Sequence, residues 1–290
     1  MHVELDGMSL TIRQTVAVAR DKACTVSLAA RARQRLDDMR RYIERQWLNE
    51  SAPPMYGFNT GLGKLKDTRI PITHILQFQR STINAHSAGV GEPVPEDVVR
   101  ATLLLRANAL ARGVSGPRSE VVERLIAMLN AGVHPVIPQK GSVGASGDLA
   151  PLAYLAGALV GHERAEAFYR GTRMPARDAL AAAGILPEFE LEAKDGLALI
   201  NGSTVSLAYA VLALDDARRL VTNADIALAV SLEAIRGEMA AFDERVQEAR
   251  PHPGQAATAA NVRELTRASK RCTPAAREIV LPDEGRVPAQ

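Results

Sequence analysis

The chain has 290 residues, of which 47% are hydrophobic and 23% are charged, and its formal net charge is +2. This composition can form a hydrophobic core, which excludes a low-complexity disordered chain. The basic residues are dispersed, so we expect no nucleic-acid partner. The apolar run 149–160 is too short for a bilayer, and the acidic N-terminus does not resemble a signal peptide. We therefore expect no membrane partner.

The two cysteines, Cys24 and Cys272, are far apart in the sequence and have no neighbouring histidine. This arrangement indicates neither a zinc site nor a disulfide framework, so we expect a cytoplasmic protein without a metal ion. Aromatic residues make up 4% of the chain, and alanine is abundant. This balance favours close-packed helices over a β-sandwich, and the fold class that we predict is mainly α.

The spacing of apolar residues predicts helices in chain order over 27–47, 96–112, 119–129, the stretch between Gly202 and Gly237, and 263–270. Ser27 is the expected N-cap of the first helix, and Gly113 follows the expected end of the second. The segment 205–214 is apolar on nearly every face, which predicts a helix buried within a bundle. Glycine-rich loops interrupt the helical pattern at 56–63, 141–147 and 194–203.

The most informative loop lies in the run Lys140-Gly141-Ser142-Val143-Gly144-Ala145-Ser146-Gly147-Asp148-Leu149-Ala150-Pro151-Leu152-Ala153. It fits a tight turn that enters a helix with Asp148 as the N-cap. A phosphate-binding loop is disfavoured, because the glycine spacing does not match the dinucleotide fingerprint and Asp148 would repel a phosphate.

The same three small residues, Ala145, Ser146 and Gly147, also allow a reaction of the backbone. The Gly147 nitrogen can attack the Ala145 carbonyl carbon, and loss of water from the ring and of the Ser146 hydroxyl would leave an electrophilic methylidene-imidazolone.

This run resembles the signature of the aromatic amino-acid ammonia-lyases and the related aminomutases. Other segments resemble further blocks of that family in the same order: Tyr56-Gly57-Phe58-Asn59-Thr60-Gly61-Leu62-Gly63, His86-Ser87-Ala88-Gly89-Val90-Gly91, Gly196-Leu197-Ala198-Leu199-Ile200-Asn201-Gly202 and Ala249-Arg250-Pro251-His252-Pro253-Gly254-Gln255. The resemblance implies an ammonia-lyase/fumarase-like fold. It also implies that Ala145, Ser146 and Gly147 become the prosthetic group 4-methylideneimidazole-5-one (MIO), with no metal and no nucleotide.

The resemblance implies roles for three other residues. Tyr56 would be the catalytic base that removes the β-proton, Asn201 would hold polar groups of the substrate beside the electrophile, and His86 would contact the substrate ring. By residue type alone, Tyr56 could equally be a turn aromatic, Asn201 a helix cap and His86 a structural histidine. A histidine at position 86 argues against phenylalanine as the substrate, and it leaves histidine and tyrosine open.

The implied reaction is the elimination of ammonia from an aromatic L-amino acid, foremost from L-histidine to give trans-urocanate. The alternatives are a tyrosine or phenylalanine ammonia-lyase and a 2,3-aminomutase. A truncated, inactive paralogue that acts as a binding partner is an alternative of another class.

The resemblance extends to the N-terminal part of the family only. We expect residues 1–201 to form an MIO-bearing N-terminal region with loops, and residues 202–290 to form the first helices of a long, incomplete central helical bundle. Family members continue with an Asp-x-Tyr-Ser-x-Arg segment, whose arginine binds the substrate carboxylate. We therefore expect this chain alone to be inactive, and to act on its small-molecule substrate as a homotetramer or in complex with a C-terminal half.

Overall fold

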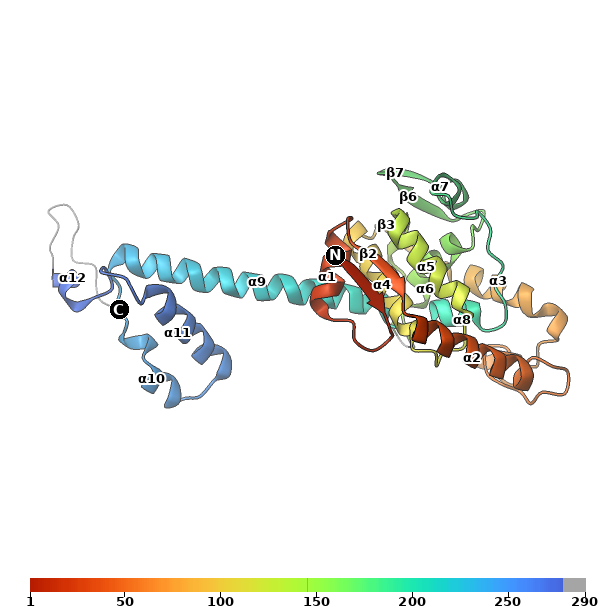
Figure 1. Cartoon of the computed structure of the whole chain (residues 1–290), viewed down its shortest axis with the longest axis horizontal. Helices are drawn as coiled ribbons and strands as arrows, with labels where there is room; N and C mark the ends of the chain where they lie inside the picture. Colours follow the sequence, from red (N-terminus) through yellow and green to blue (C-terminus); the bar gives the residue numbers. More distant parts are fainter. Residues whose placement is uncertain (145, 279–290) are drawn as a thin grey trace. The chain divides into compact units, whose positions relative to one another are not determined.

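A computed structural model describes residues 1–144 and 146–278. The chain divides into two compact units, Met1–Ala213 and Leu214–Gln290. Helices dominate each unit, which confirms the predicted mainly α fold (Figure 1). The long helix α9 (Thr204–Ile235) contains the division between the units.

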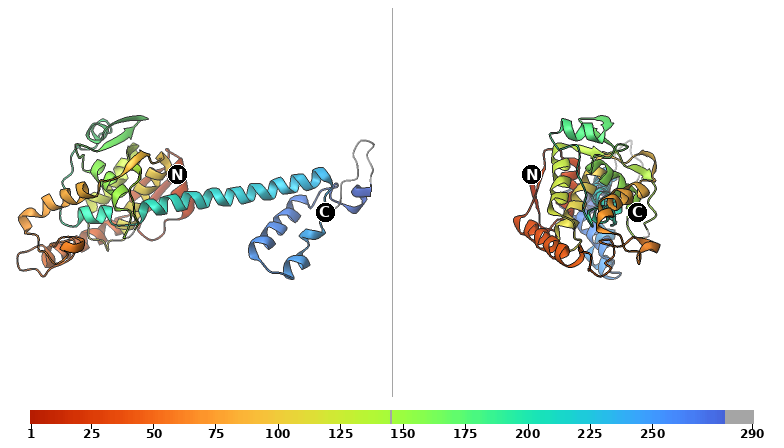
Figure 2. Two further views of the ribbon diagram at one scale, coloured as in Figure 1. Left: turned by 180° about the vertical axis from the view of Figure 1, so that it is seen from behind. Right: turned by 90° about the vertical axis from the view of Figure 1, so that its right-hand side faces the viewer.

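The first unit combines helices with short pairs of strands. Its helices are α1 (Ile12–Arg20), α2 (Ala30–Trp47), α3 (Ile75–His86), α4 (Glu96–Ala111), α5 (Ser119–Ala131), α6 (Leu149–Leu159), α7 (Ala176–Ala182) and α8 (Asp195–Ile200), with 3-10 turns at Gly63–Leu65 and Ile72–His74. Its strands are β1 (His2–Leu5), β2 (Thr25–Leu28), β3 (Val90–Pro93), β4 (Val133–Pro135), β5 (Pro138–Lys140), β6 (Glu166–Tyr169) and β7 (Thr172–Pro175). β1 pairs with β2 in parallel, β3 pairs with β5 antiparallel, and β4, β6 and β7 form an antiparallel sheet. The β6–β7 hairpin and α7 lie at the periphery of the unit in each view (Figures 1 and 2).

The core of this unit is built on α4 and α6. Helix α4 packs against α1, α2 and α5, while α6 packs against α3, α5 and α8. Leu103, Leu110 and Leu152 are completely buried. Burying a leucine side chain stabilises the fold by about 1.5 to 3 kcal/mol. This interior of leucines and small residues therefore fixes the positions of the loop that precedes α6 and of the turn that follows α8.

Most of the predicted helices are present, and the exceptions have physical causes. α4 and α5 begin where predicted, and α5 ends at Ala131, which is followed by Gly132, a left-handed C-cap residue with φ of 73°. The predicted N-cap at Ser27 is wrong, because Ser27 pairs with Glu4 of β1 and the helix begins only at Ala30. The last predicted helix is displaced: α11 spans Pro253–Thr266, with the proline in its first turn.

The second unit continues α9 with η3 (Ala240–Phe242), α10 (Glu244–Glu248), α11 and α12 (Pro274–Glu278). Asn261 of α11 donates a hydrogen bond to Asp225 of α9 at 2.8 Å. The predicted helix between Gly202 and Gly237 is confirmed. The burial expected of its segment 205–214 is incomplete in this chain, since Ala208 is 0% exposed but Leu207 is 49% exposed. Residues 195–235 are also long and apolar enough, by length and composition alone, to cross a membrane. The sequence-based expectation overlooked this stretch, and a core helix of a bundle meets the same criterion.

Candidate functional site

The glycine-rich loop runs from β5 to α6, and glycine conformations shape it. Gly141, Gly144 and Gly147 have φ angles of 143°, 65° and 124°, which side chains of L-residues rarely adopt. A Cβ atom on Gly147 would lie 2.6 Å from the backbone nitrogen of Gly202, so only glycine fits at this position. Ser146 precedes it and is exposed. Ala145, the first residue of the predicted MIO triad, lies outside the described residues.

Asp148 fastens this loop to the start of α9. Its side chain is 1% exposed and accepts hydrogen bonds from the Ser142 hydroxyl at 3.0 Å and from the Ser206 backbone N–H and hydroxyl, both at 2.8 Å. Its own backbone N–H donates to the Gly202 carbonyl at 2.8 Å. Asp148 therefore directly precedes α6, as the simple turn interpretation predicts, but its carboxylate connects segments distant in sequence rather than capping α6.

Asn201 stands in the turn between α8 and α9. Its backbone N–H donates to Leu197 at 2.9 Å, and its side chain is exposed. The next residue, Gly202, contacts both Gly147 and Asp148. The structure thus brings two of the three predicted glycine-rich loops into direct backbone contact, with Ser146 and Asn201 exposed on either side of that contact.

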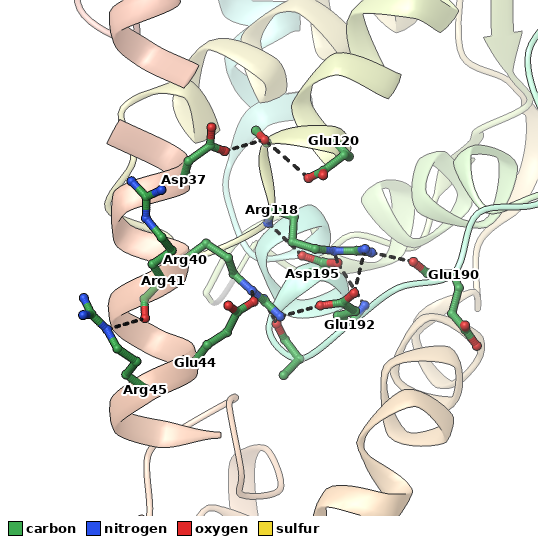
Figure 3. A network of polar contacts seen from close by, with 12 residues as sticks. Asp37, Arg40, Arg41, Glu44, Arg45, Arg118, Glu120, Glu190, Glu192 and Asp195 are labelled. Atoms are coloured by element: carbon green, nitrogen blue, oxygen red, sulfur yellow. Dashed lines mark hydrogen bonds and ion pairs between the residues drawn. The ribbon is translucent and has the colours of Figure 1, made fainter. Parts of the chain in front are cut away.

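An ionic network around the buried Asp195 holds the other end of α8 (Figure 3). Asp195 is 0% exposed, and its carboxylate accepts hydrogen bonds from Arg118 Nε at 2.8 Å, from the Arg118 backbone at 3.0 Å and from the Glu192 backbone at 2.9 Å. Arg40 of α2 reaches Glu192 at 2.7 Å. Charged hydrogen bonds of this kind are strong when they are buried, so they fix α8 relative to α2 and α5 and thereby fix the turn that carries Asn201.

His86 is the last residue of α3, and one of its ring nitrogens is already used. Its Nδ1 atom lies 2.6 Å from the Thr82 carbonyl oxygen. Because a carbonyl oxygen can only accept, Nδ1 carries the proton in this contact, and a neutral ring presents Nε2 as an acceptor. The chain after His86 approaches the glycine-rich loop: a Cβ atom on Gly141 would lie 2.8 Å from the Gly89 Cα atom.

Tyr56 belongs to a turn that the side-chain amide of Asn59 holds in place. Asn59 is 2% exposed, and its amide group binds the Met55 backbone N–H at 2.7 Å and the Trp47 carbonyl at 3.1 Å. The side chain of Tyr56 is 46% exposed, and its hydroxyl oxygen accepts one long hydrogen bond from the Gly63 N–H at 3.4 Å. The backbone of the turn is therefore held in place, while the phenol of Tyr56 stays accessible.

A cavity of about 440 Å³ connects the Tyr56 turn with α8. Its walls include Phe58 on one side and Leu197 and Asn201 on the other, and two cations, Lys194 and Arg106, also line it. Burial lowers the pKa of Arg106 to about 10 and lowers that of Lys194 below its usual value. Lys194 also lies over the Phe58 ring, 4.8 Å from its centroid.

The predicted site residues are thus distributed unevenly. Ser146, Gly147 and Asn201 meet around Gly202, whereas within the described ranges no hydrogen bond joins the side chains of Tyr56, His86 and Asn201 to one another. Sequence reasoning missed the structural importance of Arg106 and Asp195. In the sequence Arg106 is one charged residue in a predicted helix and Asp195 is one in a predicted loop, and nothing marks either as buried. The described residues contain no cluster of three or more histidine, cysteine, aspartate or glutamate side chains placed to hold a metal ion.

This geometry can be compared with known proteins. The family model for aromatic amino acid lyases matches residues 10–286. The chain belongs to the aromatic amino acid lyase family. It is 48% identical over 271 residues to the histidine ammonia-lyase of Caldanaerobacter subterraneus subsp. tengcongensis, a match that covers 93% of this chain and 52% of that protein. The chain thus spans about half the length of the curated relatives it matches.

Solved structures of this lyase family agree with the fold. Tyrosine aminomutase from Streptomyces globisporus is 35% identical, and its superposition covers 92% of this chain and 49% of that chain with a TM-score of 0.85. Histidine ammonia-lyase from Trypanosoma cruzi is 37% identical, with 91% and 50% coverage and a TM-score of 0.83. The resemblance seen in the sequence motifs is therefore confirmed at the level of family and fold.

Proposed function

We propose that this chain is the part of an ammonia-lyase that carries the electrophile, and that the complete enzyme converts L-histidine to trans-urocanate. One observation carries the proposal: Gly147 is held at φ of 124° against Gly202, directly after an exposed Ser146. A glycine here leaves the attacking nitrogen without a side chain that would hinder it. The identity of 48% to a curated histidine ammonia-lyase supports the choice of reaction.

The residues present fit an MIO group. Cyclisation joins the Gly147 nitrogen to the Ala145 carbonyl carbon, whose oxygen leaves as water with the amide protons of Gly147 and Ser146 while that carbon forms a C=N bond to the Ser146 nitrogen. Ser146 then loses its hydroxyl and α-proton as a second water. Gly147 has no side chain to hinder this attack, and Asp148 anchors the following peptide to α9. When formed, the group supplies an electrophile that neither a side chain nor a metal provides, and the protein supplies orientation.

The other residues then bind and move protons. Tyr56 is exposed on its turn and can remove the β-proton of the substrate as a general base. Asn201 can hold the polar groups of the amino acid beside Ser146. His86 presents Nε2 as an acceptor, because its Nδ1 is bound to Thr82, and this acceptor matches the N–H of a substrate imidazole.

The same observation on His86 supports a second candidate. A phenol O–H can also donate to Nε2, and the S. globisporus protein of similar fold is a tyrosine aminomutase. Tyrosine is therefore the alternative substrate, with either elimination of ammonia or its 2,3-shift as the reaction. A binding paralogue without activity is the alternative of another class.

We further propose that the chain works in the cytoplasm within a larger helical assembly, either a homotetramer or a complex that includes a C-terminal half. Apolar side chains that are 49% to 69% exposed lie along α9, among them Leu207, Leu220 and Val230. Exposed apolar faces of this kind are typical of surfaces that pack against further helices. Light scattering of the purified chain, alone and co-expressed with the C-terminal half of a curated relative, measures the state. A chain that stays monomeric and does not bind that half would contradict the proposal.

The test of the reaction offers histidine, tyrosine and phenylalanine in turn to the chain alone and to the chain co-expressed with the C-terminal half of a curated relative. Ultraviolet absorbance follows the conjugated acid, and mass spectrometry identifies it. We expect urocanate from histidine in the complemented protein. Formation of coumarate or β-tyrosine from tyrosine would show that tyrosine, and not histidine, is the substrate. A complemented protein that contains MIO and yields no product from any of the three would favour the binding paralogue.

A further inference from the structure

Arg106 of α4 holds together the two helices that flank Asn201. Its side chain is 5% exposed. Nη2 donates a hydrogen bond to the Ala198 carbonyl near the end of α8, and Nη1 donates to the Thr204 hydroxyl at the start of α9, at 3.2 Å. Because both bonds come from one planar guanidinium, they fix the distance between the two helix ends.

The same guanidinium lies against the turn between these helices. A Cβ atom on Gly202 would clash with Nη1 of Arg106, so the backbone of the turn packs directly on the charged group. On its other side Gly202 accepts the hydrogen bond from Asp148 and packs against Gly147. A continuous series of contacts therefore runs from Arg106 through Gly202 to the glycine-rich loop.

Arg106 is poorly suited to a role in stability alone. Within the described part of the chain it forms no ion pair, and its Nε atom is buried without a hydrogen-bond partner. Burying a cation without a carboxylate is unfavourable, which agrees with the lowered pKa of this group. Its hydrogen bonds to the Ala198 carbonyl and the Thr204 hydroxyl, together with its packing on the Gly202 backbone, suit it instead to fixing the geometry of the turn 201–203.

We propose that Arg106 is a positioning residue for the electrophile: by fixing the turn 201–203, it presses Gly202 against Gly147 and holds the loop in the conformation that cyclises. The proposal rests on the proposed function, since it concerns the formation of the MIO group. It assigns Arg106 no contact with the substrate. Formation of the MIO group then depends on α4, a helix that carries none of the predicted site residues.

Arg124 of α5 provides a matched control. It is also buried, its pKa is also lowered to about 10 by burial, and it also donates to backbone carbonyls, those of Leu159 and Leu186. Among the described residues it has no hydrogen bond to the turn 201–203 or to the glycine-rich loop, and it is not among the nearest neighbours of Gly147 or Gly202. Replacing Arg124 therefore removes a comparable buried cation without altering the contacts to Gly202.

The experiment compares R106M, R106K and R124M with the unmodified sequence. Peptide mass spectrometry measures the fraction of chain that has lost two waters at 145–147, and hydrogen exchange measures protection of the Asp148 amide. We expect the modified fraction to fall by about tenfold in R106M, to recover partly in R106K and to stay unchanged in R124M. The Asp148 amide should lose protection in R106M only.

Equal modification in R106M and the unmodified sequence would overturn the inference, and so would equal losses in R106M and R124M. If R106M does not fold, R106K decides: modification below that of R124M supports the inference, and modification equal to it overturns it. If the unmodified sequence has lost no water even when it is folded and bound to a co-expressed C-terminal half, the proposed function fails. Hydrogen exchange then decides the positioning role, because selective loss of protection at Asp148 supports it and unchanged protection overturns it.

Discussion

The two sides of the candidate site are built differently. On the side of the electrophile, Asp148 is 1% exposed and connects the loop to Ser142, Gly202 and Ser206. On the side of the base, Tyr56 is 46% exposed, and its hydroxyl forms one hydrogen bond of 3.4 Å. The first unit therefore anchors Asp148, the residue after the proposed electrophile, by buried hydrogen bonds, and it leaves the side chain of Tyr56, the proposed base, accessible.

Because of this difference, we expect substitutions on the two sides of the site to have different effects on stability and on activity. Changes on the electrophile side that reach the buried hydrogen bonds should affect folding and activity together, whereas changes to exposed side chains should affect activity alone.

Replacing Ser146 with alanine should remove the hydroxyl that leaves during MIO formation. We expect the complemented enzyme to lose activity by a factor on the order of 10³ or more, since the demanding chemistry depends on the electrophile. The melting temperature should stay close to that of the unmodified protein, because Ser146 is exposed. Steady-state rates and thermal unfolding measure both quantities, and retained activity would contradict the assignment of Ser146.

Replacing Tyr56 with phenylalanine should lower kcat by about 10²-fold to 10⁴-fold, the usual contribution of a general base. The free energy of unfolding should change by less than about 0.5 kcal/mol, because the exposed hydroxyl forms one long hydrogen bond. Kinetics and urea unfolding of the same preparation test the pair of expectations. A large loss of stability would show that the Tyr56 turn is as tightly built as the loop.

Replacing Asp148 with alanine should destabilise the first unit by about 2 to 3 kcal/mol, because the Ser206 N–H and two hydroxyl groups lose a buried acceptor. Urea denaturation measures this loss. Asn59 offers the comparison on the base side, since N59A also removes buried hydrogen bonds to Met55 and Trp47. We expect N59A to leave the modified fraction at 145–147 unchanged, whereas D148A should reduce it.

His134 predicts a pH effect on the fold that is independent of the site. Burial lowers its pKa from 6.5 to about 4, and Arg100 lies 3.3 Å from its Nε2 atom. Because the unfolded chain binds the proton first, this contribution is complete above pH 6.5 and is lost as the pH falls toward 4.

We expect the folded protein to lose about 2 kcal/mol from this group between pH 7 and pH 5. Unfolding of H134Q in the same buffers gives the control, since the difference between the two proteins isolates the histidine. Parallel curves for the two proteins would contradict the assignment.

The sequence predicted the helical class and the residues around the electrophile, but it did not predict what holds them. α4 was bounded correctly because a long apolar pattern ends before Gly113. Its buried arginines could not be identified, because Arg100 and Arg106 occur in a helix that also carries exposed polar residues. Whether an arginine faces solvent or a distant carbonyl depends on tertiary packing, which periodicity does not encode.

The same limit applies to His86 and to Ser27. The motif around His86 marked it as a candidate, yet only the structure shows that Thr82 binds Nδ1 and leaves Nε2 as the acceptor. Ser27 has the residue type of an N-cap, but pairing with β1, a contact between segments far apart in the sequence, draws it into a strand.

The central claim is that this chain holds the loop that becomes its electrophile. Peptide mass spectrometry of the segment containing 145–147 tests it most directly, with S146A as the reference. We predict a mass lower than the sequence requires by two water molecules, together with a near-ultraviolet absorbance that S146A lacks. A segment with the full mass of Ala-Ser-Gly, in protein that binds its assembly partner and is folded, would contradict the claim.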